Sequence, residues 1–414
     1  MSTNEVVTHW PAKSVERPVA KALQQPMADY YLMIALAAAL TGFGLFMVLS
    51  ASSVIGMDQE NDPYYFGKWQ LLFAVIGVGV AFILSRLNAR VYSAMAIVCL
   101  LVIMIVLAVV IAKGGPGVAV GDQQAWLKIG SLRQVQPSEF AKPIIIVWGA
   151  AVFSQPRRAQ NLDNTWRLIL PYLPMTLMVL GLVIGEKDLG TALIFAVIIL
   201  LQLWLVGAKG KVIAALVAVF GAGGGVVFWL SPTHLSKFTD FLAFRFPSLH
   251  LTPSGASDQP DNAIFALASG GWWGTGPGTS RQKWGGLYNG AHTDYILAVL
   301  GEELGLFGIL IVLGLLFLFV WTGIRIAKNS TQPNSFWRLA ASGVTGWIAV
   351  QALINTMVAF GLLPVIGVTF PFLSYGGSSL LACSIGVGVL LAAARNEPEA
   401  LKARALVAQR KKKR

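Results

Sequence analysis

Three carboxylates, Asp294, Glu302 and Glu303, lie close together at the entrance to a long apolar run, in the stretch GAHTDYILAVLGEELG. An ionisable group near the core of a bilayer is costly and is a functional candidate by default. Asp294 follows His292 and Thr293, and a carboxylate in a partly desolvated pocket can have the tuned pKa that a general base requires. We therefore predict that Asp294 is a catalytic base. The alternative, a solvated residue at the membrane interface, stays open for all three carboxylates and suits Glu303 best.

The spacing of small residues predicts how this stretch presents Asp294. If the stretch is a helix, Asp294 shares one face with the small residues Ala298, Gly301, Gly305 and Gly308. A face of small residues lets another helix or a ligand approach closely. We expect Asp294 to project into an outer cavity, with Glu302 about 12 Å further along the helix axis and the two glutamates near the membrane interface.

A glycine-rich stretch, GGWWGTGPGTSRQKWGG, precedes these carboxylates and holds seven glycines and three tryptophans. Glycine lets the backbone approach a ligand, and successive free N–H groups can form a nest for an anion. Arg281 and Lys283 add two positive charges, so the stretch could hold a phosphate or diphosphate. A plain flexible loop is the alternative, and the tryptophans also suit a membrane interface or the face of a sugar.

The stretch QVQPSEFAK predicts the start of a helix that carries an ion pair. Pro137 suits a first helical position and Glu139 suits the first turn. Glu139 and Lys142 are three positions apart in the sequence and are expected to pair on one helix face. Arg133, just upstream, is a further candidate cation. A purely structural helix start is the alternative.

Two interruptions between apolar runs are also candidates. The turn EKDLGTA leaves Asp188 at membrane depth, where it needs a partner, either in a structural ion pair or in a direct role. The segment LLPVIGVTFPFLSYGGSS is rich in proline, glycine and serine, so we predict a broken or re-entrant segment that protein or a wet cavity must surround. Its candidate site and supporting residues are Pro371, Gly376, Gly377 and Ser378.

The composition indicates a polytopic membrane protein. Of the 414 residues, 56% are hydrophobic and 12% are charged, with a mean hydropathy of +0.67, whereas soluble domains carry about 25% charged residues. The first 28 residues are polar and do not resemble a signal peptide. Cys99 and Cys383 lie within apolar runs and are expected to be buried hydrophobes, and the four histidines have no metal-ligand spacing.

Ten apolar segments are each about long enough to cross a bilayer as a helix. They are 30–54, 68–86, 91–112, 138–154, 167–185, 189–206, 212–230, 304–322, 339–361 and 378–394. The predicted fold is therefore an all-α polytopic membrane protein of about ten transmembrane helices. A large extracytoplasmic loop, about 231–303, separates the seventh helix from the eighth.

The distribution of charge predicts the orientation. With the N-terminus in the cytoplasm, 21 of the 31 lysines and arginines lie on the inner side, so the positive-inside rule places both termini there. The predicted parts are a cytoplasmic tail 1–28, a transmembrane domain 29–394 and a basic cytoplasmic tail 395–414. The ending RKKKR suits anionic lipid, and no nucleic-acid partner is expected. The candidate polar residues then gather on the outer face.

Five stretches taken in order resemble the SEDS family of shape, elongation, division and sporulation proteins. They are VLSASS, QPSEFAK, KDLGTA, GTGPGTSRQKWGGLYNGAHTDYILAVLGEELG and PFLSYGGSS. The resemblance covers nearly the whole membrane portion and implies the family's ten-helix fold with both ends inside. KWGG after Lys283 favours the cell-division member over the rod-elongation member.

The resemblance also implies an activity. Such proteins are inverting peptidoglycan glycosyltransferases that polymerise lipid II, which serves as both donor and acceptor, on the outer face of the bacterial cytoplasmic membrane. They work at the division septum with a class B penicillin-binding protein and other division-complex membrane proteins. The family's essential aspartate falls on Asp294, its conserved Glu and Lys fall on Glu139 and Lys142, and its Ser-x-x-Lys falls on Ser280 and Lys283.

The resemblance leaves some points open. His292, Glu302 and Ser378 are included as substrate-binding candidates, and a divalent cation, Mg or Mn, is a candidate cofactor. The chain departs from the family pattern at Trp69, Tyr288 and Asn289, which puts any role of these positions in doubt. Two other functions stay open: a lipid II flippase with the broken segment as a gate, and a non-catalytic division scaffold.

Overall fold

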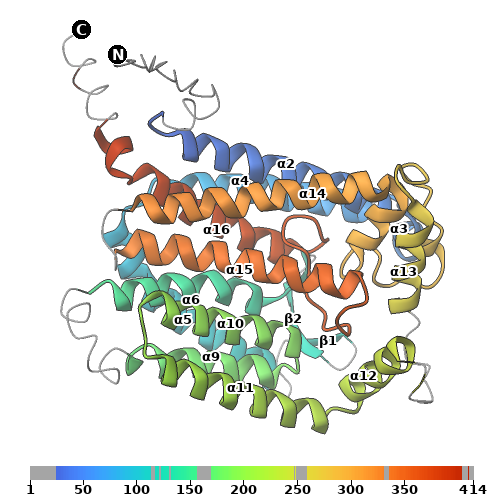
Figure 1. Cartoon of the computed structure of the whole chain (residues 1–414), viewed down its shortest axis with the longest axis horizontal. Helices are drawn as coiled ribbons and strands as arrows, with labels where there is room; N and C mark the ends of the chain where they lie inside the picture. The colour runs from blue at the N-terminus through green and yellow to red at the C-terminus, as the bar shows by residue number, and fades with distance from the viewer. Residues whose placement is uncertain are drawn as a thin grey trace, which may run out of the picture.

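The computed structural model describes residues 25–112, 117–120, 123–129, 132–155, 169–246, 248, 259–330, 335–402 and 409. Long helices lie side by side in one bundle, and the shorter elements gather at one end of it (Figure 1). Most of the two predicted cytoplasmic tails, 1–28 and 395–414, lies outside the described residues.

Each of the ten apolar segments coincides with a helix. The helices are α2 (Ala28–Ala51), α4 (Tyr65–Ser85), α5 (Ala89–Ile111), α6 (Pro137–Phe153), α9 (Leu173–Gly185), α10 (Leu189–Leu205), α11 (Gly210–Leu230), α14 (Ile296–Asn329), α15 (Phe336–Ala359) and α16 (Gly377–Arg395). Seven helices in the described part of the chain are long and apolar enough to cross a membrane. Because α6, α9 and α10 have only 17, 13 and 17 residues, the helical membrane fold is confirmed while the count of ten spans stays a prediction.

The end of the bundle that carries the predicted outer loops holds the shorter elements. These are α3 (Ser53–Glu60), α12 (Pro232–Arg245), α13 (Gln259–Gly270), the 3-10 turn η2 (Gln282–Trp284), and the strands β1 (Gly117–Val120), β2 (Gln123–Ile129) and β3 (Leu132–Val135). The strands form an antiparallel sheet in the order β1-β2-β3, in which Val118 pairs with Trp126 and Leu127 with Val135. The all-α class of the membrane domain is confirmed, and this small sheet in an outer loop is an addition that was not predicted, because strands this short carry too weak a period to stand out in the sequence.

The opposite end of the bundle brings together the start of α2 and the ends of α14 and α16 (Figure 1). Arg325 Nε on α14 lies 3.1 Å from Asp29 Oδ1 on α2. A polar cavity of about 680 Å³ at this end is lined by both residues and by Glu397, just past α16. The described membrane portion therefore begins and ends on the same side, as an even number of crossings requires.

The centre of the bundle consists of α15, α16 and α6, whose side chains are mostly buried, whereas α11 buries none. Buried polar side chains gather on the central helices, among them Lys142, Gln351 and Asn355. Polar groups at membrane depth need protein partners because lipid offers none. The outer part of this polar centre is where the candidate site lies.

Candidate active site

Asp294 lies in the turn that leads into α14, which begins at Ile296. Three successive backbone carbonyls of this turn are held by other parts of the chain. His292 O accepts from Tyr375 N at 2.8 Å, Thr293 O accepts from Ser374 Oγ at 2.6 Å, and Asp294 O accepts from Asn355 Nδ2 at 2.9 Å. The backbone at Asp294 is thus fixed by contacts from distant segments.

The side-chain carboxylate of Asp294, unlike its backbone, is not held by hydrogen bonds from the described residues. It is half-buried, and none of the described residues donates a hydrogen bond to it. Burial raises its pKa to about 6; the positive charge of Lys237 opposes the rise, and the negative charge of Asp188 adds to it. A carboxylate with a pKa near 6 is ionised at neutral pH and still basic enough to take a proton.

The predicted pair of Glu139 and Lys142 is formed on α6. Lys142 Nζ lies 2.6 Å from Glu139 Oε1, and both side chains are almost fully buried. The ammonium also donates to Gln351 Oε1 on α15 at 3.2 Å, and Trp347 Nε1 donates to the same oxygen at 2.7 Å. The ion pair therefore belongs to a polar network that joins α6 to α15.

Asp188 has uncharged partners. Its carboxylate caps the start of α10 by accepting from Thr191 N at 2.9 Å and accepts from Gln136 Nε2 at 2.8 Å. Gln136 N in turn donates to Ser378 Oγ at 2.9 Å. Glu186, in the same turn, is buried near Asp188, and burial with that neighbouring negative charge raises the pKa of Glu186 to about 8. Asp188 and Ser378 are thus joined through Gln136, whose side-chain amide contacts Asp188 and whose backbone N–H contacts Ser378.

The broken segment is confirmed between the end of α15 and the start of α16. The chain from 361 to 376 is not helical, and Pro371 is buried among protein. Both polar atoms of the Gln70 side chain on α4 bind this segment. Nε2 donates to Ser374 O at 3.2 Å, and Oε1 accepts from Gly376 N at 3.3 Å. Gly377 is glycine because a Cβ would lie 2.4 Å from the Phe73 ring.

The helix predicted over the three carboxylates begins only at Ile296, so Asp294 precedes it, and the helix is kinked at Gly305. Its φ is 67° and its ψ is −169°, so the face of small residues does not continue past this point and that expectation was wrong. The glycine-rich loop fills the break: Thr275 N and Gly276 N donate to the freed carbonyls of Glu302 and Glu303. Leu306 N and Phe307 N donate back to carbonyls of the loop. The loop and the kink thus satisfy each other's backbone groups.

The glutamates beside the kink are buried. Ser280 Oγ donates to Glu302 Oε2 at 2.5 Å, and Arg281 N donates to Glu302 Oε1 at 2.8 Å. Lys283 Nζ lies 3.0 Å from Glu303 Oε1 and also donates to Gly278 O at 2.7 Å. Both glutamates are at most 2% exposed, so the alternative that they are solvated was wrong, while their position near the membrane interface stays a prediction.

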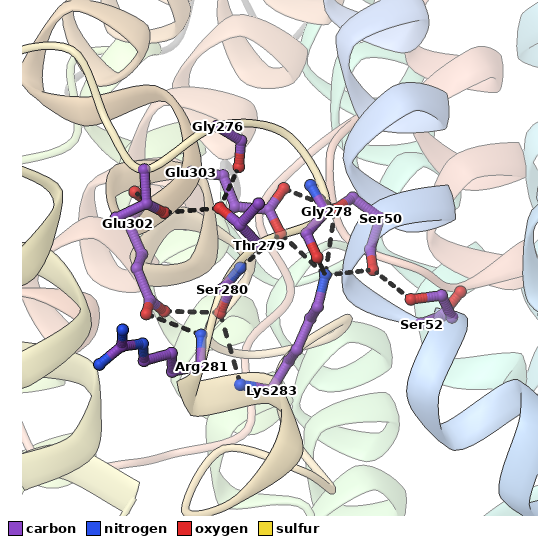
Figure 2. Close-up of polar contacts among 12 residues, drawn as sticks. Ser50, Ser52, Gly276, Gly278, Thr279, Ser280, Arg281, Lys283, Glu302 and Glu303 are labelled. Carbon is purple, nitrogen blue, oxygen red and sulfur yellow. Dashed lines mark hydrogen bonds and ion pairs between the residues drawn. The ribbon is translucent and has the colours of Figure 1, made fainter.

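This second cluster ties the loop to α2. Ser50 Oγ donates to Glu303 Oε2 at 2.5 Å, Lys283 Nζ donates to Ser50 O at 3.2 Å, and Gly278 N donates to Ser50 Oγ at 3.2 Å. Figure 2 shows Lys283 reaching between the loop and Ser50. The N–H groups and the lysine proposed for a phosphate are thus engaged by the protein's own carboxylates and carbonyls.

The structure places the remaining candidates as follows. The backbone of Arg133 lies on β3, the Arg281 side chain is exposed, and His292 is buried with its ring centroid 5.0 Å from that of Phe66. Among the positions that depart from the family pattern, Tyr288 donates to Asp58 Oδ2 at 2.5 Å, Asn289 is exposed, and Trp69 packs on Phe73 with a ring separation of 6.1 Å.

Sequence reasoning missed three buried amides, Gln70, Gln351 and Asn355. Each has an exposed fraction of 1% or less, and each bonds to the broken segment or to Asp294. A signal was present, because polar side chains within predicted membrane spans are functional candidates. Gln351 and Asn355 also stand four residues apart, on one face of a helix.

A metal site is not formed by side chains alone in the part of the chain that the structure describes. It contains no group of three or more His, Cys, Asp and Glu side chains placed to hold an ion. Glu186 is protonated at neutral pH according to its raised pKa, which makes it a poor cation ligand unless the ion displaces its proton.

The fold is a helical membrane fold, and a half-buried aspartate lies at one end of its polar centre. The class of protein is therefore a polytopic membrane protein with a candidate catalytic site near one surface. The chain belongs to the FtsW/RodA/SpoVE family of cell cycle proteins, whose model matches residues 30–399. This confirms the resemblance that the motifs predicted.

The chain is similar to proteins of several bacteria. It is 34% identical to the probable peptidoglycan glycosyltransferase FtsW of Trichlorobacter lovleyi, over 88% of this chain and 93% of the relative. It is 37% identical to the protein of that name in Bacillus subtilis, over 87% and 89%. Stage V sporulation protein E of Bacillus subtilis is 34% identical, over 88% and 96%.

Two solved structures share the fold. The rod shape determining protein RodA of Thermus thermophilus matches with a TM-score of 0.61 at 25% identity, over 88% of this chain and 96% of RodA. A chain from a structure described as structural coordination of polymerization and crosslinking by a peptidoglycan synthase complex matches with a TM-score of 0.68 at 24% identity, over 89% and 98%.

Proposed function

We propose that this chain is a peptidoglycan glycosyltransferase that polymerises lipid II into glycan strands, at the outer face of the cytoplasmic membrane, for septal wall synthesis. The names of its relatives support the activity. The single observation that carries the proposal for the site is the setting of Asp294: the turn that carries it is held by three contacts, while its half-buried carboxylate has no hydrogen-bond donor among the described residues.

The proposed reaction is an inverting displacement. The carboxylate of Asp294 takes the proton from the 4-hydroxyl of the acceptor sugar as its oxygen bonds to the anomeric carbon of the donor. The bond from that carbon to the diphosphate oxygen breaks on the opposite face, and the electron pair leaves with the polyprenyl diphosphate. General-base catalysis of this kind contributes roughly 10²–10⁴-fold.

The leaving diphosphate requires positive charge. Lys142 is the buried cation whose network runs along α15 to the helix turn that holds Asp294, and Arg133 and Arg281 are further candidates. Glu139 offsets part of the charge of Lys142, and Lys283 is paired with Glu303. Both lysines are thus paired with a glutamate, but only the Lys142 network includes α15, the helix that also holds Asp294, so we assign the leaving-group role to Lys142 before Lys283.

A divalent cation stays a proposal. The side-chain arrangement supports a cation carried mainly by the diphosphate of the donor rather than by a cluster of protein ligands. When bound, such an ion would neutralise charge on the leaving group. We expect EDTA to abolish polymerisation and Mg²⁺ or Mn²⁺ to restore it; full activity in EDTA would exclude the cation.

The chain is a multi-pass membrane protein. Its concentration at the septum, its work with a class B penicillin-binding protein and its contacts with other division-complex membrane proteins are part of the proposal. The fold it shares with a chain of a peptidoglycan synthase complex is compatible with such an assembly.

The test compares two aspartates in the purified protein, with and without its transpeptidase partner, on labelled lipid II. Asp294→Asn is expected to lose glycan ladders. Asp62→Asn is the matched control, because the partners of Asp62 are the exposed Lys68 and the backbone N–H of Tyr64, away from the site; it is expected to retain them. Full polymerisation by Asp294→Asn would refute the assignment, and transport of lipid II without polymer would favour the flippase.

A further inference from the structure

We propose that Gln351 and Asn355, two buried amides on α15, are positioning residues that fix Lys142 and Asp294 relative to each other. This inference rests on the proposed function. The two residues stand four apart on one helix, so their Cα atoms are separated by about 6 Å along its axis. Neither is one of the residues that the family motifs brought forward.

Gln351 holds the lysine end of the site. Its Oε1 accepts from Lys142 Nζ at 3.2 Å and from Trp347 Nε1 at 2.7 Å. Its Nε2 donates to Thr369 O at 3.0 Å and to Thr369 Oγ1 at 3.2 Å. Two donors on one side and two acceptors on the other set the orientation of the Gln351 amide. The ammonium of Lys142 therefore has a defined position relative to α15.

Asn355 holds the aspartate end. Its Nδ2 donates to Asp294 O at 2.9 Å and to Val368 O at 2.7 Å. One amide group therefore joins the turn before α14 to the broken segment and attaches both to α15. Because the bond is to the backbone of Asp294, Asn355 sets where the carboxylate stands without neutralising it.

The two amides together form a fixed spacer. Both donate to the same stretch of broken segment, Val368 and Thr369, which braces them from the other side. An inverting displacement places the base and the leaving group on opposite sides of the reacting carbon, so the base and the leaving-group cation must be held a set distance apart. A misplacement of about 1 Å can cost 10²-fold in rate.

Apolar packing does not account for Asn355. It is 1% exposed, and its Oδ1 has no hydrogen-bond partner among the described residues. A buried unpaired acceptor is destabilising, and the two hydrogen bonds that Nδ2 donates, to Asp294 O and Val368 O, offset that cost. The geometry points instead to a residue kept for the position of Asp294.

The test uses the full-length protein with its transpeptidase partner in detergent or vesicles and measures kcat and KM on lipid II, together with the thermal midpoint. The variants are Asn355→Leu and Gln351→Met, which keep volume and remove hydrogen bonding. Thr356→Val is the matched control on the same helix, because the Thr356 hydroxyl donates only within α15, to Ala352 O at 2.8 Å.

We expect kcat to fall roughly 10–100-fold in both amide variants with KM within about threefold, and Thr356→Val to match the wild type. We also expect Gln351→Met to add little loss once Lys142 is replaced by alanine, because residues that act as one unit are not additive. If these amides were purely structural, the loss of activity would add to that of Lys142→Ala and would follow the fraction of folded protein.

The outcomes separate the two proposals. Loss of activity in Asp294→Asn combined with wild-type kcat in both amide variants would overturn the positioning role alone. A loss in Gln351→Met that is additive with Lys142→Ala would overturn it as well, as would a loss in the amide variants that is fully explained by unfolding. Wild-type activity in Asp294→Asn would instead overturn the proposed function.

Discussion

Replacing Asp294 with asparagine is expected to stabilise the folded protein while it removes the proposed base. The carboxylate is held in a half-buried turn where no described residue donates a hydrogen bond to it. Its charged form is therefore disfavoured in the folded state relative to the unfolded chain. A neutral amide of nearly the same shape escapes this penalty.

The size of the effect follows from the raised pKa. Burial lifts the pKa of Asp294 from an ordinary value of 3.8 to about 6, and a tenfold change in an equilibrium constant corresponds to about 1.4 kcal/mol. The ionised carboxylate thus lowers the free energy of unfolding by up to about 3 kcal/mol at neutral pH. Water that reaches the exposed part of the side chain reduces this, so we expect about 1–3 kcal/mol.

The sign of the pH dependence is fixed by the same shift. Because the folded state binds the proton more tightly, the stability given by protonated Asp294 is complete below about pH 4 and is lost as the pH rises through about 6. The wild type and Asp294→Asn should therefore have similar thermal midpoints at pH 4, about half of the full difference at pH 5, and the full difference at pH 8. Thermal unfolding in detergent, followed by intrinsic fluorescence, measures this.

Two results would refute the reasoning. An Asp294→Asn variant that is less stable than the wild type at pH 8 would mean that the carboxylate makes favourable contacts in the folded state. A stability difference that is the same at pH 4 and pH 8 would mean that ionisation of Asp294 is not its cause.

Three further predictions concern the base, the buried ion pair and the kink. The wild-type kcat/KM should fall tenfold for each pH unit below about 6 and level off above it, because Asp294 must be ionised to accept a proton. Lys283→Met should lower the free energy of unfolding by about 3–5 kcal/mol, because it leaves Glu303 buried without its partner, whereas Lys68→Met at an exposed pair should leave the thermal midpoint unchanged. Gly305→Ala should sharply reduce the yield of folded protein, because φ is 67° there and a Cβ would lie 2.4 Å from Gly274 N.

Each of these has a contradicting outcome. A flat rate profile between pH 5 and pH 7 would point to another base. Equal stability losses in Lys283→Met and Lys68→Met would mean that the buried pair adds nothing beyond its exposed counterpart. A well-folded Gly305→Ala protein would mean that the loop does not approach the kink as closely as described.

Much of the fold follows from local features of the sequence. Long apolar runs predicted all ten bundle helices, because helix length and hydropathy are local properties, although α14 extends several residues beyond the predicted segment at both ends. The start of α6 at Pro137 and the pair of Glu139 with Lys142 followed from spacing within one helix turn. The broken segment followed from its prolines and glycines.

The candidate site required the tertiary structure. The hydrogen bond from Lys142 to Gln351 joins residues 209 positions apart in the chain, and the bond from Asn355 to Asp294 joins residues 61 apart. Spacing within one element cannot report such contacts. The glycine-rich loop shows the same limit: its composition suits an anion nest, but only the fold brings Glu302 and Glu303 into it.

The sequence by itself determined which segments are apolar enough to enter the membrane and which carboxylate is the candidate base. The reason is that polar and charged side chains are costly in lipid, so hydropathy along the chain reports both. Only the tertiary structure distinguished the two buried lysines, because it ties Lys142 to α15 and Lys283 to the contact between the loop and α14. The reason is physical: Lys142 and Lys283 have the same charge, and the partners that distinguish them come from other helices.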